Sequence, residues 1–547
     1  MASSRIDKFA SWISPSWGLK RQIARNRAER MKALGGKTLA NIRGFEAVSG
    51  DRLRYDTVST NQNVDSFIAN GGTEALRQHV RYMEFQTGFV RGPISRIVNN
   101  VVGSGFQFQA RIRATDDFAI SEASSDKLNR SIERGYAKWC KESDQRLIHQ
   151  FWTQLRQIEG ALVRDGEVLV VGRQSNRPGR FIPYCQQVLE VDRLRTPPGE
   201  ITNPRMRDGI LYDSEGVPEI YFILKRHPGD TLTPGIGLRA DDYEEIPAFW
   251  PNGTRKVFYL FNPIRPEQLR GFSMFGPALK DMQDLDRYRE AEIMAALEDA
   301  CMTGIVKTDS ASIFQDAYTQ GLDANGNRIR IHDFAPLKWH YLNPGEEASI
   351  HSPQRPNTAF GEFTEQLQMG PANALDIPTE VMTQNWHGLN YSNARTILLQ
   401  LYMVCRIRQK YLIDYYASPT YECVLSDMVA NGRVKADRFY AYRDEYLAHT
   451  WIAPGQAWVD PDRETSGIDR ELNNNTENLA RVWARKGEDW EEQLEIEARI
   501  LRKKKELEAK YDIIFPNPQK DQGVKDDKAE EEPGAQPAKP KRMELVK

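Results

Sequence analysis

Apolar residues recur along the chain with two different spacings, and these spacings divide its first half into helices and strands. A helical repeat covers residues 94–102 and 151–164, whereas apolar residues at 106–112 alternate as in a strand. A turn after the second helix leads into an apolar strand at 167–171. The pattern predicts a subdomain that mixes helices and strands and reaches to about residue 263.

A long helical pattern at residues 273–300 changes the character of the sequence. Pro277 falls in its first turn, where proline is tolerated, and Ser273 suits the N-cap position. At ~1.5 Å per residue, such a helix would be about 40 Å long. Two further helices are predicted at 358–373 and 392–416, on either side of a polar loop with an aromatic residue at its centre.

A small β-rich insertion is predicted between the first two of these helices, around a turn at residues 323–326. Its strands are expected at residues 304–308, 328–331 and 337–341. The insertion therefore connects one long helix to the next.

Charge dominates the two ends of the chain. Residues 17–43 are basic and favour a helix, which we interpret as a solvated arm lying on a neighbour in preference to a phosphate-binding segment. Residues 468–511 are predicted to form charged helices with a break near Gly487. The tail from residue 517 has too few apolar residues to offset its ordering entropy, so we expect it to be disordered.

Composition narrows the class of protein. The chain has 547 residues, 40% of them hydrophobic, and a chain of this length is expected to divide into several subdomains. Its formal charge is −2, so a role on nucleic acid must be local or must not depend on tight binding. Five scattered cysteines without a C-x-x-C pair predict reduced thiols. No apolar run is long enough to span a bilayer, which predicts that the chain does not insert into membranes by itself.

The sequence lacks the motifs of common catalytic and metal sites. Residues 35–38, G-G-K-T, resemble a phosphate loop only in part, because Met31 occupies the position of the leading glycine. Residues 271–276 resemble a nucleophile elbow, but the second glycine is one residue late. The histidines form no metal-ligand pair, and the acids at 281–286 favour a solvated or channel-facing stripe over a two-metal site. The sequence therefore offers no set of residues that matches one of these catalytic or metal sites.

Residues 374–395 carry the most specific signal in the chain. The run A-L-D-I-P-T-E-V-M-T at 374–383 precedes N-W-H-G-L-N-Y-S-N-A-R at 385–395. Together they resemble the signature of lambda-type phage portal proteins, roughly G-I-P-Y-E-x-L-T followed by aromatic-S-G-x-N-Y-S-S-A-R. The departures are Asp376, Thr379 and His387, which replace the glycine, the aromatic residue and the serine of that pattern.

Other segments resemble the same family in the same order. The run R-P-E-Q-L-R-G at 265–271 resembles the segment before the family's long helix, and N-P-G-E at 343–346 and S-P-Q-R-P at 352–356 resemble later ones. N-N-V-V-G-S-G at 99–105 and W-V-D-P at 458–461 fit its first and last landmarks. The resemblance therefore extends over nearly the whole chain to about Tyr511.

The resemblance implies an α+β, mainly helical portal fold that assembles into a dodecameric ring with a central channel. Each subunit would have a wing, a stem, a clip and a crown. The segments implied are an N-terminal arm and wing at 1–272, a stem helix at 273–300, a clip at 301–356, a second stem helix at 357–378, a tunnel loop at 379–392, the following long helix at 393–416, the returning wing at 417–466, a crown at 467–512 and a disordered tail at 513–547.

Three groups of residues are candidate sites in such a ring. Acids on the stem would repel DNA phosphates over roughly 8 Å at physiological salt and let the duplex pass: Asp281, Asp284, Glu292 and Glu298. Short polar groups and one ring of the tunnel loop would touch DNA, with packing of the ring on a neighbouring subunit as the alternative: Gln384, Asn385, Trp386, His387 and Gly388. The clip would dock terminase and connector proteins: Asp323, Asn325, Arg328 and Arg330.

The implied function is a channel at one capsid vertex for DNA packaging and ejection, without enzyme activity, cofactor or metal. The implied partners are double-stranded DNA, the terminase large subunit, the major capsid and scaffold proteins, and head-tail connector proteins. The protein would lie in the virion after assembly in the host cytoplasm. The competing class is a nuclease or a packaging ATPase, whose phosphate loop or carboxylate metal set is missing from the sequence.

Overall fold

The computed structural model describes Val64 and residues 72–115, 118–230, 239–301, 305–307, 340–342, 360–455, 461–486 and 488–511. The chain divides into two units, Met1–Phe67 and Ile68–Lys547, and the fold below is that of the second. The predicted basic arm and the predicted disordered tail lie outside the described residues.

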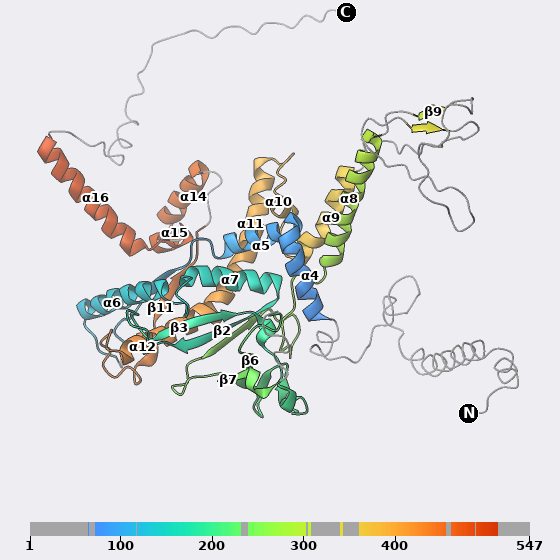
Figure 1. Cartoon of the computed structure of the whole chain (residues 1–547). Coiled ribbons are helices and arrows are strands. Elements are labelled where there is room, and N and C mark those ends of the chain that lie inside the picture. Colours follow the sequence, from blue (N-terminus) through green and yellow to red (C-terminus); the bar gives the residue numbers. More distant parts are fainter. Residues whose placement is uncertain are drawn as a thin grey trace, which may run out of the picture. The chain divides into compact units, whose positions relative to one another are not determined.

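The second unit begins with helices and then adds sheets (Figure 1). Its first elements are α4 (Thr73–Gln86), α5 (Gly88–Val101), β1 (Gln107–Ala110), α6 (Glu122–Lys141) and α7 (Phe151–Arg164). The helix predicted at 151–164 is thus confirmed, and the strand predicted at 106–112 is confirmed in its central part. The mixture of helices and strands follows the two apolar spacings of the sequence.

Two antiparallel sheets follow α7. In the first, β2 (Glu167–Gln174) lies between β3 (Tyr184–Leu189) and β8 (Val257–Phe261). The second runs in the order β4 (Met206–Arg207), β5 (Ile210–Tyr212), β6 (Pro218–Leu224) and β7 (Tyr243–Pro247). Residues 167–172 of β2 are all buried, which explains why this strand appears in the sequence as a continuous apolar run and not as an alternation.

Aromatic side chains join segments from both ends of the sequence into one core. Phe151 on α7 stacks on Tyr416, with ring centroids 5.7 Å apart, and both are fully buried. Trp139 on α6 donates from Nε1 to the carbonyl of Tyr184 at 2.9 Å. Strand β1 pairs with β11 (His449–Ile452), and α12 (Ser418–Ala430) and α13 (Arg443–Tyr446) lie between Tyr416 and β11 in the sequence. The segments at 72–272 and 417–455 therefore build one body.

Helix α8 (Leu279–Cys301) packs beside α9 (Phe360–Ala374), and Figure 1 shows the two running together. The predicted start of α8 at 273 is wrong, because the preceding residues turn back onto α7. Met274 N donates to the carbonyl of Val163 at 3.3 Å, and Ser273 Oγ accepts from Phe275 N at 3.1 Å. Ser273 therefore closes a turn and is not the N-cap of α8, and Pro277 precedes the helix.

The described part of the predicted insertion is one pair of short strands. Strand β9 (Ile305–Lys307) pairs in parallel with β10 (His340–Leu342), which confirms strands near 304–308 and 337–341. The predicted strand at 328–331 and the turn at 323–326 lie outside the described residues.

The predicted tunnel loop at 379–392 is wrong in extent. Its first five residues form helix α10 (Thr379–Thr383), because Val381 and Met382 are buried in the core and the helix packs against α5. The irregular segment is limited to residues 384–390, and α11 (Tyr391–Leu412) follows it. A π-helical turn, Ile413–Ala417, carries α11 into α12, so the helix predicted to stop at 416 continues.

The charged segment near the C-terminus forms α14 (Pro461–Asn473), α15 (Leu479–Lys486) and α16 (Trp490–Tyr511). Helices within the predicted 468–511 are thus confirmed, but the first of them begins at Pro461 and not at 468. Ion pairs tie α16 to the first half of the unit: Arg111 to Glu491 at 3.0 Å, and Arg130 to Glu495 at 2.7 Å. Of the described helices, none is apolar over a length that could cross a membrane.

Candidate channel segments and the junction that holds them

Helices α8 and α9 contact each other through one face of each. Tyr288 stacks on Phe360 with ring centroids 5.6 Å apart, and it meets the edge of Phe363 at 5.1 Å. Further along the pair, a Cβ at Gly370 would lie 2.7 Å from a carboxylate oxygen of Asp281. The missing side chain at Gly370 therefore leaves room for that carboxylate against α9.

The acids predicted to line the channel do not form one exposed stripe. Asp281, Tyr288 and Glu292 are spaced by seven and four residues, so they share the face of α8 that packs on α9, and all three are half-buried. Asp284 lies off this face and is exposed. The side chain of Glu298 lies outside the described part of the chain. The structure thus places Asp281 and Glu292 on the same face of α8 and leaves Asp284 as the exposed acid of the described three.

The five residues predicted for the tunnel loop lie together on one exposed turn. Gln384 ends α10 with a φ of 58°, and Gly388 has a φ of 75°. The side-chain oxygen of Asn385 accepts from His387 N at 3.2 Å. All five residues are exposed, and 42% of the surface of Trp386 is accessible to solvent. This turn offers an aromatic ring and amide groups to a partner.

Both helices that flank the turn are fixed. Asn390 caps α11 by accepting from Asn393 N at 2.9 Å. Deeper in α11, Arg408 forms an ion pair of 2.6 Å with the buried Glu159 of α7, and Tyr411 donates to the carbonyl of Phe261 at 2.7 Å. The turn is therefore carried on a support that is tied into the core.

Asp376, which stands where the family signature has glycine, has a φ of 56°. This left-handed conformation favours glycine and is tolerated by aspartate. The glycine of the signature is thus explained by the backbone before α10. The clip residues Asp323, Asn325, Arg328 and Arg330 lie outside the described residues, and their role stays a prediction.

A buried carboxylate that is not among the predicted site residues holds Arg270 and Gly271, in the segment before α8, which we call the root of α8. Glu167, at the start of β2, is 1% exposed. Its two oxygens accept from Arg270 at 2.8 and 2.9 Å, and one oxygen also accepts from Arg77 at 2.6 Å. The backbone N–H of Gly271 donates to Glu167 at 3.0 Å, and the Tyr259 hydroxyl also donates to it. Burial alone would raise the pKa of Glu167, but Arg270 and Arg77 hold that pKa below its usual range.

Two glycines let the backbone close around this carboxylate. A Cβ at Gly166, whose φ is 84°, would lie 1.9 Å from the carbonyl oxygen of Phe272. A Cβ at Gly271 would lie 2.3 Å from the carbonyl oxygen of Gly166. The turn before β2 and the segment before α8 therefore interlock. The sequence signal was present in R-P-E-Q-L-R-G, whose last two residues both bind Glu167.

The same ion-pair network extends along α4. Arg81 forms ion pairs of 2.8 Å with both Asp165 and Asp192. Burial would raise the pKa of Asp192, but Arg77 and Arg81 hold it below its usual range. Glu167, Asp165 and Asp192 come from the first sheet and its adjoining turns, so α4, this sheet and the root of α8 share one buried charge network. We call it the stem junction.

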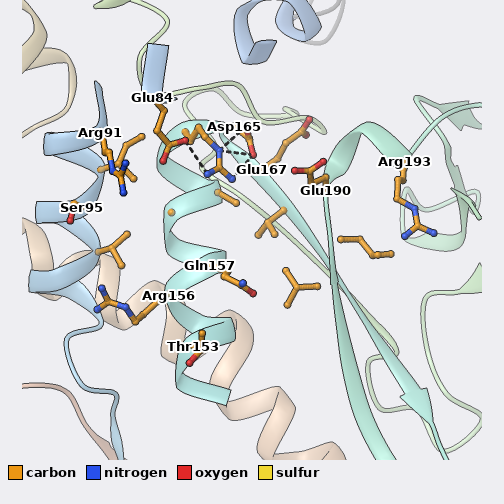
Figure 2. Close-up of a pocket in the computed structure, with 18 of the residues that line it drawn as sticks. Glu84, Arg91, Ser95, Thr153, Arg156, Gln157, Asp165, Glu167, Glu190 and Arg193 are labelled. Atoms are coloured by element: carbon orange, nitrogen blue, oxygen red, sulfur yellow. Dashed lines mark hydrogen bonds and ion pairs between the residues drawn. The ribbon is translucent and has the colours of Figure 1, made fainter. Parts of the chain in front are cut away.

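A cavity of about 800 Å³ lies beside the stem junction (Figure 2). Its charged lining is rich in guanidinium groups: Arg91, Arg146, Arg156, Arg164 and Arg193. Arg164 pairs with Glu84 and Asp165, each at 3.2 Å, at the end where Figure 2 labels these acids. The volume is that of a site for a small molecule or a short peptide. A DNA duplex does not fit a cavity of this volume.

Among the described residues, one group has metal-ligand spacing: Glu190, Asp192 and His227. His227 lies 3.0 Å from Glu190 and 4.0 Å from Asp192. Arg81 already occupies one oxygen of Asp192 at 2.8 Å, and Arg77 lies 3.8 Å from the other. Two arginines next to the central carboxylate disfavour a divalent cation there.

The family model and the relatives that match this chain agree on one family. Residues 50–409 match the model of the family "Phage portal protein, lambda family". A "Probable portal protein" of Halomonas phage phiHAP-1 is 24% identical over 425 residues, which cover 76% of this chain and 78% of the relative. "Portal protein B" of Escherichia phage lambda is 19% identical over 430 residues, covering 74% of this chain and 79% of the relative.

Among solved structures, the chain is similar to one titled "Virion of native gene transfer agent (GTA) particle", at 11% identity and a TM-score of 0.32. That similarity covers 76% of this chain and 93% of the other, but it is too loose to support a conclusion. The family match covers well over half of the chain, and it includes the loop signature and the R-P-E-Q-L-R-G segment that binds Glu167. This protein therefore belongs to the lambda family of phage portal proteins.

Proposed function

We propose that this portal protein is one subunit of a dodecameric ring at a capsid vertex, and that α8, α9 and the turn at 384–390 line its DNA channel. The observation that carries the proposal is the turn itself. Its polar and aromatic residues are all exposed, while the helices on both sides of it are tied into the core. Such a turn can meet a moving partner without being displaced.

A channel for DNA must guide the duplex without holding it. Each ~1.4 kcal/mol of phosphate binding would slow a step of the duplex about tenfold. The chain has a formal charge of −2, and Asp284 is exposed on α8. Acids repel phosphates over roughly one Debye length, so an acidic stem favours sliding. Asp281 and Glu292 contribute negative charge from the face of α8 that packs on α9.

The stem junction gives the proposed channel a rigid base. Arg270 and Gly271, directly before the turn that leads to α8, are held by Glu167 of the first sheet. A load on the stem would reach the body of the subunit through this buried network. The network therefore supports a conduit that keeps its shape while DNA is pushed in and later released.

The partners follow from the same proposal. Residues 301–356 would dock the terminase large subunit and later the head-tail connector proteins, with Asp323, Asn325, Arg328 and Arg330 at the contact. Major capsid and scaffold proteins would surround the ring, which would assemble in the host cytoplasm. ATP hydrolysis would belong to the terminase and not to this chain.

Electron microscopy of the purified full-length protein tests the ring. We expect closed rings of twelve subunits with a central hole of duplex width, because each subunit presents its stem to the same axis. Compact monomers that cleave DNA in the presence of divalent cations would contradict the proposal and support a nuclease.

Packaging assays test the contact between the turn and DNA. We expect particles with Trp386→Ala and His387→Ala to lose packaged DNA about tenfold faster, the factor for a lost contact of ~1.4 kcal/mol. Tyr440→Ala is the control, since Tyr440 is an exposed aromatic residue outside the proposed channel segments. Packaging and retention equal to those of the control would show that the turn does not contact DNA.

A further inference from the structure

Helix α11 carries apolar residues on two opposite faces. Leu401, Cys405 and Leu412 lie on one face and are buried in the core. Leu399, Met403 and Ile407 recur every fourth residue on the opposite face, and they are 51%, 67% and 72% exposed. We call these three residues the α11 ridge. No described residue of the chain covers it.

The composition of the ridge does not suit a surface in water. A surface helix normally has charged or polar residues opposite its buried face. Side chains spaced by four residues form the rows that insert into the groove of a second helix. Three large apolar side chains in such a row therefore indicate a helix contact that the described residues of this subunit do not supply.

The ridge is also held in place before any partner arrives. On the buried side of α11, Arg408 pairs with Glu159, and Gln409 donates to the carbonyl of Val101 at 3.0 Å. A rigid surface loses little conformational entropy on binding, which favours a stable contact.

We propose that the α11 ridge packs against α9 of a second copy of this chain, as one half of the contact between neighbouring subunits. The inference rests on the proposed ring. A cyclic ring is built from a heterologous contact, in which two different surfaces of the same chain meet. The ridge supplies one surface, and its partner must be a different surface with matching properties.

The outer face of α9 has these properties. Glu362, Glu365 and Met369 share one face of α9, all three are exposed, and Met369 is 45% accessible. On α11, the cations Arg406 and Lys410 stand beside the ridge and are exposed, and Lys410 also forms an exposed ion pair of 2.7 Å with Asp414. The apolar side chains of the ridge would thus meet Met369, and the two glutamates would lie near the cations. This match of apolar groups and of charge is what selects α9 of a second copy.

Two single-surface variants of the full-length protein test the contact. The double variant Met403→Glu with Ile407→Glu places two charges in the α11 ridge. The single variant Met369→Glu places a charge in the proposed contact surface of α9. A charge placed in an apolar contact weakens it roughly 30-fold or more. We expect each variant alone to be a monomer in native mass spectrometry, while the wild type and the control Ala137→Glu, at an exposed position of α6, form rings.

Mixing the two monomeric variants gives the decisive result. Each retains the surface that the other lacks, so the mixture is expected to form pairs and no rings. Thermal unfolding of each variant near the wild-type midpoint shows that folding is intact. Rings from either variant at the wild-type yield, or a mixture that stays monomeric, would overturn the inference. Wild-type protein that forms no rings would instead contradict the proposed function.

Discussion

Replacing Glu167 by glutamine is expected to lower the free energy of unfolding by about 3–5 kcal/mol, the usual cost of removing one partner from a buried ion network. The carboxylate of Glu167 accepts from Arg77, Arg270, Tyr259 and the N–H of Gly271. A neutral amide would leave the guanidinium groups of Arg77 and Arg270 without their shared charge. Urea unfolding of the purified chain, followed by circular dichroism, measures the loss.

The matched control is Glu74→Gln, which removes an ion pair with Arg195 in which both side chains are exposed. Such pairs contribute about 0–1 kcal/mol, so the control should unfold close to the wild type. Equal losses for the two variants would contradict the assignment of the stem junction. Particles carrying Glu167→Gln are also expected to assemble poorly, because the root of α8 would no longer be fixed.

The pH dependence of the free energy of unfolding provides a second test of the Glu167→Gln variant. The pKa of Glu167 is lower in the folded protein than in the unfolded chain. Its contribution is therefore fully present above the unfolded pKa and is lost as the pH falls through the folded pKa. Because Asp192 also has a lowered pKa, Glu167→Gln should reduce the loss of stability in acid without abolishing it.

Replacing Gly166 by alanine is expected to lower the free energy of unfolding by several kcal/mol, more than the same replacement at Gly216, a second glycine with the same φ. The new Cβ would lie 1.9 Å from the carbonyl oxygen of Phe272, so the backbone of the segment before α8 would have to move. Strain from overpacking, typically about 1–3 kcal/mol, adds to about 1 kcal/mol for the left-handed backbone. Urea midpoints again give the measurement.

Gly216→Ala separates the two contributions. Gly216 has the same φ of 84°, but a Cβ there would meet nothing within 4 Å. This variant should show only the smaller backbone cost. If Gly166→Ala were no more destabilising than Gly216→Ala, the close approach between the turn before β2 and Phe272 would not exist in solution.

The sequence determined the elements whose signals are local. The helix at 151–164 was predicted with its bounds, and the presence of charged helices within 468–511 was also confirmed. Apolar spacing and capping residues act over a few positions, so they can be read directly from the chain. The family signature is likewise a linear pattern, and the match at 50–409 bears it out.

Tertiary contacts decided the start of α8 and the extent of the loop. Residues 274–278 have a helical pattern, but Met274 binds the carbonyl of Val163, which belongs to α7. Residues 379–383 looked like a polar loop, yet Val381 and Met382 are buried, and the segment folds as α10 against α5. In both cases the contact that decides the local conformation comes from a distant part of the chain.

The functional surfaces divide in the same way. The sequence by itself picked out residues 384–388 within a loop predicted at 379–392, because these residues are consecutive and the signature around them is specific. It could not place Asp281 against α9, nor find the stem junction, whose charged residues lie between Arg77 and Arg270 in the sequence. A buried charge is stable only where opposite charges surround it, and only the folded chain shows which distant residues do so.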